Sequence, residues 1–335
     1  MRGVARRSLL KRQRATFVSR GRGTVGKTTV GEHLLAKPKS SICIIRKVGG
    51  IGDVLMLTPV LREIKRQYPD CHLTFAIDMH STGNNVYYEL VKNAPFVDEF
   101  VDARYVQHGK YDCTWDASAV CLRYERQGLP AINRIDLFAR AAGINLVSKR
   151  PFYQVEEQER IRATHAIAGR TTVLLHTASN EDKRCWPIEK YVELVQEMDS
   201  LSIVFLVMDF NGKHHGWNKK SNCIDISNCS IRELGAYIEQ VDLFVGPDSG
   251  PMHMAGALGT RSIVLFGSIP PEARINYYTE HQAITADLTC LGCWYAKCPY
   301  DVKCMKDIEV QRVLQIIKEV VGETESSAKE TNCKA

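Results

Sequence analysis

Residues 41–67, SICIIRKVGGIGDVLMLTPVLREIKRQ, decide the fold of this chain. The segment opens with an apolar, β-branched run at 42–48, which is typical of a parallel strand covered on both faces. From residue 54 onward, apolar residues recur at the spacing of one helical face, and most charges fall elsewhere. The pattern therefore predicts a buried strand, a glycine-bearing turn and an amphipathic helix, which is the repeating unit of an α/β fold.

The turn of this unit is the first candidate site. Gly49, Gly50 and Gly52 omit side chains where the backbone must turn sharply or admit a ligand. Asp53 follows them at the carboxyl end of the strand, which is where open α/β sheets bind their ligands. Aspartate is also a common helix cap, and a carboxylate spent on backbone amides is a weaker base. The sequence leaves both roles open for Asp53.

Length and charge indicate two domains and a basic arm. The chain has 335 residues and 44% apolar content, enough for two domains with a core each. Residues 1–40 carry eleven Lys and Arg against one acid, so their net charge of +10, within a total of +6, leaves −4 for the rest. Such an arm would suit nucleic acid or an anionic membrane surface.

The arm also contains a P-loop pattern, GRGTVGKT at 21–28. A working P-loop follows a buried strand and opens a helix, but residues 15–19 form a poor strand, and the helix must stop by Pro38. We expect a flexible basic arm here rather than a nucleotide site.

Cysteine usage bears on the compartment. Twelve cysteines would suggest disulfides in an exported protein, but the first twenty residues hold too short an apolar run for a signal peptide. No run of eighteen apolar residues exists, which argues against a spanning helix. The sequence thus predicts a cytoplasmic protein with reduced thiols.

Strand and helix patterns alternate through the first half and restart in the second. Strands are expected at 72–77, 96–101, 111–117, 172–176, 202–208, 224–226, 243–245 and 262–266, and helices at 84–92, 133–142, 187–198, 230–240, 252–258 and 307–321. The alternation implies two α/β halves with parallel sheets, which usually face each other across a cleft. The expected parts are a basic arm at 1–40, an N-terminal domain at 41–165, a C-terminal domain at 166–322 and a flexible tail at 323–335.

The second half has its own turn between a strand and a helix. Asp248, Ser249 and Gly250 precede a helix whose N-terminus offers amide donors and a partial positive charge, which suits a diphosphate. His253 falls on the first turn of that helix and could reach the same anion. The alternative is that Asp248 or Ser249 merely caps the helix.

The loop after strand 172–176 reads TASNEDKRCWP at 177–187. Thr177 and Ser179 can hydrogen-bond a ligand, and Lys183 can neutralise a phosphate as a point charge. A solvated loop lysine is the alternative for Lys183.

Three segments together carry a family resemblance: GGIGD at 49–53 with the TPVLREIKRQYP that follows, HTASNEDKRCWP at 176–187, and GPDSGPMHMAGALGTRSIVLFG at 246–267. In order and spacing they resemble the motifs of glycosyltransferase family 9, the bacterial heptosyltransferases, over roughly residues 41–320. The chain departs from the family pattern by one additional residue before Trp186 and by Pro251 after Gly250.

The resemblance implies a GT-B fold, with two Rossmann-like domains whose parallel sheets face across a cleft. It also implies metal-independent, inverting transfer of a sugar from a nucleotide-diphosphate sugar, the donor substrate. By position, the family's general base falls on Asp53 and its phosphate-binding lysine on Lys183. The family's donor-diphosphate turn and histidine fall on Asp248, Ser249, Gly250 and His253.

A cysteine cluster precedes the last helix. Cys290, Cys293, Cys298 and Cys304 are separated by loops short enough to arrange four thiolates around a structural zinc or iron ion. Similar clusters occur near this position in members of the family, and some related enzymes hold iron there. Reduced, buried thiols are the alternative.

These observations predict an inverting glycosyltransferase that moves heptose or a similar sugar to an acceptor hydroxyl, with a lipopolysaccharide-core-like glycan as the acceptor. The expected location is the cytoplasm, peripheral to the inner membrane. Two alternatives stay open: a phage-type transferase that modifies hydroxylated DNA bases, and a non-catalytic nucleic-acid- or partner-binding protein on a degenerate transferase scaffold. The basic arm would suit either DNA or the membrane.

Overall fold

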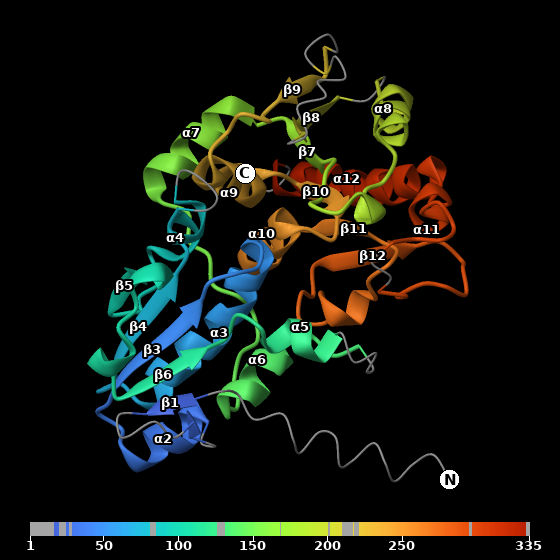
Figure 1. Ribbon diagram of the computed structural model, residues 1–335. Coiled ribbons are helices and arrows are strands. Elements are labelled where there is room, and N and C mark those ends of the chain that lie inside the picture. The colour runs from blue at the N-terminus through green and yellow to red at the C-terminus, as the bar shows by residue number, and fades with distance from the viewer. Residues whose placement is uncertain are drawn as a thin grey trace. The chain divides into compact units, whose positions relative to one another are not determined.

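Figure 1 shows the computed structural model of the chain, which describes residues 17–19, 25–26, 29–80, 85–125, 131–167, 169–199, 202–209, 217, 221–294 and 297–332. The chain forms two compact units, Met1–Gln154 and Val155–Ala335. Counted over the described residues, each unit is built on one six-stranded sheet.

The sheet of the first unit has the strand order β2-β1-β6-β3-β4-β5. Strands β3 to β6 run parallel, and β1 runs antiparallel to both β2 and β6. The strands are β1 (Phe17–Ser19), β2 (Val25–Gly26), β3 (Ser41–Arg46), β4 (His72–Ile77), β5 (Glu99–Asp102) and β6 (Cys113–Asp116). The helices are α2 (Val30–Ala36), α3 (Ile51–Gln67), α4 (Val86–Val91), α5 (Val120–Glu125) and α6 (Arg134–Ala142).

The segment 41–67 folds as its pattern predicts. β3 lies in the middle of the sheet, and its apolar residues are fully buried, as expected of a strand covered on both faces. α3 begins at Ile51 and packs against α4 and α6, with its apolar positions buried. The predicted strand, glycine turn and helix are confirmed.

Part of the expected basic arm belongs to the folded unit. Thr29 and Glu32 form a capping box that starts α2, and this helix buries Val30 and Leu34. Phe17 lies opposite Trp115 where β1 pairs with β6. Because basic residues dominate 1–40, these few apolar positions do not stand out in the sequence, and the segment therefore suggests a flexible arm. Residues 1–16, 20–24 and 27–28, with most of the P-loop pattern, lie outside the described residues.

The sheet of the second unit is parallel throughout, with the order β12-β11-β10-β7-β8-β9. Its strands are β7 (Thr171–His176), β8 (Ile203–Met208), β9 (Cys223–Asp225), β10 (Leu243–Pro247), β11 (Ser262–Phe266) and β12 (His281–Thr285). Its helices are α7 (Glu157–Ile167), α8 (Ile188–Glu197), α9 (Ile231–Gln240), α10 (Gly250–Leu258), α11 (Lys303–Lys306) and α12 (Val310–Asn332). This is the doubly wound strand order, in which the chain reverses direction across the sheet between β7 and β10.

The boundary between the units lies eleven residues before the expected one, at 154/155 instead of 165/166. The reason is α7, which packs on α9 (Figure 1). Buried Glu159 pairs with Arg232 at 2.6 Å, and Arg160 pairs with Glu239 at 2.7 Å. These ion pairs attach α7 to the second unit, although its sequence is polar enough to resemble a linker.

The C-terminal end also differs from the expectation of a flexible tail at 323–335. α12 continues to Asn332, because the residues after Gly322 include good helix formers and no proline. In the part of the chain that the structure describes, no helix is both long and apolar enough to cross a membrane.

Candidate functional site

In the first unit, the candidate site lies where β3 and β6 end side by side. Asp53, in the first turn of α3, is 7% exposed. Its Oδ2 is 3.1 Å from Nη2 of Arg46, the last residue of β3, and its Oδ1 is 2.5 Å from Nη1 of Arg134, the first residue of α6. Arg46 also donates from Nη1 to the carbonyls of Ala117 and Ser118, just after β6. The acid is therefore held at the carboxyl edge of the sheet by two guanidinium groups.

Asp53 takes the capping role that the sequence allowed. The amide of Gly50 donates to Asp53 Oδ2 at 3.0 Å, which is half of a capping box at the start of α3. Each carboxylate oxygen thus has at least one donor before any substrate arrives. Tyr87 adds a further contact by donating to the carbonyl of Gly49 at 2.7 Å. Burial raises the pKa of the Tyr87 phenol, so this donor stays protonated at neutral pH.

Gly49 is the glycine that this arrangement requires. Its φ is +120°, and a Cβ built on it would lie 2.3 Å from Arg46 Nη2 and 2.6 Å from Asp53 Oδ2. A side chain here would therefore push apart the ion pair that holds the acid. Gly50 differs, because a Cβ on it would meet no atom within 4 Å.

In the second unit, the candidate site lies at the point where the strand order reverses. Ser249 follows β10 and is the N-cap of α10, yet its hydroxyl makes no side-chain cap hydrogen bond. Instead, its Oγ is 3.1 Å from Nδ1 of His176, the last residue of β7. His176 is fully buried, and burial lowers its pKa to about 3, so the ring is neutral. The interpretation of Ser249 as a simple helix cap is wrong.

Asp248 forms ion pairs with two arginine side chains. Its Oδ2 is 3.3 Å from Arg184 Nη1 and 3.5 Å from Arg274 Nε, and the side chains of Asp248 and Arg274 are both buried. Arg184 also donates to the backbone carbonyl of Asp248 at 3.1 Å, and Arg274 lies over the ring of Trp294. Asp248 thus brings two guanidinium groups to the turn that precedes α10.

His253 lies in the first turn of α10 and is buried. Its Nδ1 is 2.8 Å from the Tyr278 hydroxyl. Burial raises the pKa of Tyr278 well above its usual range, so the phenol keeps its proton, and the tautomer of His253 decides which of the two groups donates the hydrogen bond. Gly256 allows this contact, since a Cβ there would lie 2.7 Å from the Tyr278 ring.

The loop at 177–187 reaches the same turn through some of its residues. Ser179 donates from Oγ to the Asp248 carbonyl at 3.3 Å. Thr177 is buried and bonds to the Met208 carbonyl through both its amide and its hydroxyl, so it contacts the sheet. Lys183 pairs with Glu181 at 3.3 Å. The loop residue that contacts Asp248 through a charge is thus Arg184, which follows the predicted Lys183.

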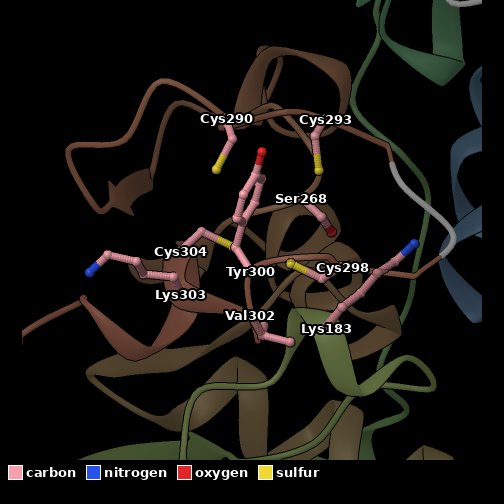
Figure 2. Close-up of a pocket in the computed structure, with 9 residues that line it drawn as sticks. All are labelled: Lys183, Ser268, Cys290, Cys293, Cys298, Tyr300, Val302, Lys303 and Cys304. Carbon is pink, nitrogen blue, oxygen red and sulfur yellow. The ribbon is translucent and has the colours of Figure 1, made fainter.

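The cysteine cluster lines a pocket (Figure 2). Its walls are Lys183, Ser268, Cys290, Cys293, Cys298, Tyr300, Val302, Lys303 and Cys304, and in Figure 2 the ammonium group of Lys183 points away from the thiols. These cysteines carry free thiols. Among the described residues, however, no group of three or more His, Cys, Asp or Glu is arranged to hold a metal ion. The four thiols therefore line one pocket, and the structural zinc or iron site that their spacing suggested stays a prediction.

Five important residues were not among the sequence candidates: Arg46, Arg134, His176, Arg184 and Arg274. Two of them, Arg46 and His176, could have been identified from the sequence. Arg46 and His176 are polar residues that end otherwise buried strands, and a buried polar group needs a partner. Arg134, Arg184 and Arg274 are separated in the sequence from their partners Asp53 and Asp248, and no local pattern identifies them.

The two parallel-sheet α/β units, each with a candidate site at the carboxyl edge of its sheet, have the GT-B architecture of glycosyltransferases. The family model of glycosyltransferase family 9 (heptosyltransferase) matches residues 119–303. The chain belongs to this family and is a heptosyltransferase-like glycosyltransferase, so the predicted fold and enzyme class are confirmed.

Curated relatives and solved structures agree with this assignment. Lipopolysaccharide heptosyltransferase 1 of Campylobacter coli is 22% identical over 84% of this chain and 99% of its own length. Lipooligosaccharide heptosyltransferase 2 of Campylobacter jejuni is 30% identical, but the match covers 28% of this chain and 30% of that protein. The structure of Escherichia coli ADP-heptose lipopolysaccharide heptosyltransferase II has a TM-score of 0.65 at 15% identity, and the alignment covers 85% of this chain and 99% of that one.

A further structural relative bears on the cysteine pocket. The iron-containing dodecameric glycosyltransferase TibC of enterotoxigenic E. coli has a TM-score of 0.63 at 14% identity, with 84% of this chain and 78% of that chain covered. At this identity the likeness concerns the fold, and the iron is a property of TibC. None of these four relatives supports the DNA-modifying or the non-catalytic alternative.

Proposed function

We propose that this enzyme transfers heptose or a similar sugar from a nucleotide-diphosphate sugar to a hydroxyl of a lipopolysaccharide-core-like glycan, with inversion at the anomeric carbon. Family membership and the named heptosyltransferase relatives support the sugar and the acceptor class. The observation that carries the donor site is the start of α10, where Ser249 presents a hydroxyl without capping the helix. Work on such an acceptor implies a location in the cytoplasm, at the surface of the inner membrane.

In this proposal the donor diphosphate binds at the turn before α10. The helix N-terminus supplies about half a positive charge and amide donors, and the turn lies where the sheet order reverses. Ser249, Gly250 and His253 contact the diphosphate. Asp248 contributes by holding Arg184 and Arg274 near this turn, because a carboxylate itself would repel the phosphates.

Asp53 is the general base of the proposed reaction. It removes the proton of the acceptor hydroxyl as that oxygen attacks the anomeric carbon from the face opposite the leaving diphosphate, which inverts the configuration. Arg46 and Arg134 hold the carboxylate in place, and the acceptor hydroxyl donates its hydrogen bond to one of the two carboxylate oxygens. The charge that develops on the diphosphate is met by protein cations, amides and the α10 dipole, so no metal ion takes part in this scheme.

The donor site is tested by thermal unfolding with ADP, UDP, GDP and ADP-heptose. A ligand present at a hundred times its dissociation constant stabilises the folded chain by about 2.7 kcal/mol. We expect ADP and ADP-heptose to raise the melting temperature of the wild type, and Ser249→Ala to reduce that shift. If no nucleotide diphosphate and no nucleotide sugar changes the melting temperature, the donor site is wrong.

The reaction is tested by incubating the enzyme with ADP-heptose and a lipopolysaccharide-core acceptor glycan. We expect ADP release that depends on the acceptor, and NMR of the product should give the anomeric configuration opposite to that of the donor. A product with the donor's configuration would contradict the single displacement, and with it the role of Asp53.

A further inference from the structure

The contact between His176 and Ser249 joins two elements that are distant in sequence and adjacent in the sheet. His176 ends β7, and Ser249 follows β10, the strand that pairs with β7 in parallel. The contact therefore lies at the carboxyl edge of the sheet, at the reversal of strand order where open α/β folds bind ligands. The sequence around Ser249 gives no indication that His176 is its partner.

Three neighbours fix the position of His176. The Tyr191 hydroxyl donates to its backbone carbonyl at 3.1 Å, and the Phe244 ring stacks on the imidazole with centroids 6.3 Å apart. Gly246 leaves the space for it, since a Cβ there would lie 3.0 Å from both Cβ and the carbonyl oxygen of His176. Because the ring is fully buried in this way, it is neutral and has little freedom to turn.

The Ser249 hydroxyl does not make the hydrogen bond that is usual for a serine at a helix N-cap. A serine at a helix N-cap normally accepts a hydrogen bond from an amide of the first turn. Here no such bond forms, and the second residue of α10 is Pro251, which has no amide proton to offer. A hydroxyl can accept one hydrogen bond while it donates another.

Building on the donor site proposed above, we propose that His176 is a positioning residue for the donor diphosphate: its Nδ1–H donates to Ser249 Oγ, which holds the hydroxyl away from the helix end and directs its proton toward the phosphates. The same contact leaves the first-turn amides of α10 to the diphosphate. His176 acts through Ser249 and does not itself touch the substrate.

The test is a double-mutant cycle on ADP affinity, measured by isothermal titration calorimetry on the full chain. The variants are Ser249→Ala, His176→Asn and His176→Gln, with His176→Gln/Ser249→Ala as the double variant. The Asn amide nitrogen takes the place of Nδ1, whereas the Gln amide takes the place of Nε2, so the two variants separate the hydrogen bond from polarity and size. Val313→Ala is the structural control, because it removes buried apolar volume in α12 and leaves His176, Ser249 and the three neighbours of His176 unchanged.

We expect Ser249→Ala and His176→Gln each to weaken ADP binding by about tenfold, and the double variant to bind no more weakly than either single variant. His176→Asn should recover most of the affinity. Val313→Ala should lower the melting temperature and leave ADP affinity unchanged. In turnover, His176→Gln should raise KM for the donor more than it lowers kcat, whereas mere loss of folded protein lowers kcat alone.

The outcomes separate the two proposals. If Ser249→Ala leaves ADP affinity unchanged, the donor site fails. If Ser249→Ala weakens binding but His176→Gln does not, or if the two losses simply add, only the role of His176 is overturned. The tautomer is tested on ¹⁵N-histidine-labelled protein, in which the His176 signals are assigned by their loss in His176→Asn. A proton found on Nε2 instead of Nδ1 would refute the proposed direction of the hydrogen bond.

Discussion

Acidification should destabilise the second unit through His176. The ring is neutral in the folded state, with its pKa lowered by burial from 6.5 to about 3, whereas in the unfolded chain it takes up a proton below about pH 6.5. Between these two values the unfolded state binds more protons, so the free energy of unfolding falls as the pH falls. The stabilisation of the folded state by the neutral His176 ring is therefore complete above pH 6.5 and is lost progressively toward pH 3.

The size of this loss of stability follows from the lowered pKa of His176. At pH 5.0 the unfolded imidazole is 1.5 pH units below its own pKa of 6.5, which costs the folded state about 2 kcal/mol relative to pH 7.5. The matched control is His176→Asn, which has no group to titrate at this position. Because the other titrating groups are common to both proteins, the difference between their pH dependences isolates His176.

Hydrogen-exchange mass spectrometry is the appropriate assay, because peptides from β7 and β10 report the free energy of opening of the second unit itself. We expect the wild type to lose about 2 kcal/mol more than His176→Asn in these peptides between pH 7.5 and pH 5.0, after correction for the intrinsic exchange rate. Equal losses in the two proteins would refute the conclusion that His176 is buried and neutral, and with it the reason for its fixed contact with Ser249.

Three further predictions concern other parts of the chain. Asp53→Asn should lower kcat by about two to four powers of ten while ADP affinity stays unchanged, measured by ADP release and calorimetry; undiminished transfer would remove Asp53 from the mechanism. Gly49→Ala should lower the free energy of unfolding by about 1–3 kcal/mol in urea titrations, because its Cβ would collide with Arg46 and Asp53 at a positive φ, whereas Gly50→Ala should have little effect; similar losses would contradict the geometry of the turn. Cys304 should react with iodoacetamide more slowly than the partly exposed Cys290, Cys293 and Cys298, because burial and then the neighbouring thiols raise its pKa; mass spectrometry after timed quenching gives the order, and a faster reaction of Cys304 would contradict its burial.

Much of the fold could be predicted because it depends on local patterns. β4 and β11 have the bounds that their apolar runs indicated, and α9 lies within the expected 230–240, with Ser230 as its N-cap. β12, in contrast, was missed, because the stretch HQAIT has few apolar residues and becomes a strand by pairing with β11 at the edge of the sheet.

The candidate site could be predicted only in part. The glycine turn with Asp53 and the turn with Ser249 were identified, because each joins a strand to a helix and carries its signature residues together in the sequence. The charges around them were not identified. Arg134 reaches Asp53 across 81 residues, and Arg184 reaches Asp248 across 64 residues, so no sequence window contains either pair.

The sequence by itself determined the class of this protein: two α/β units, each with a turn at the carboxyl end of a buried strand, and the motifs of a glycosyltransferase family. These properties are set by residues close to one another in the chain, where periodicity and turn chemistry act. The tertiary structure alone decided which groups surround Asp53 and Ser249. Parallel strands bring the ends of distant segments to one edge of a sheet, and there burial makes His176 neutral and gives Asp53 its two guanidinium partners.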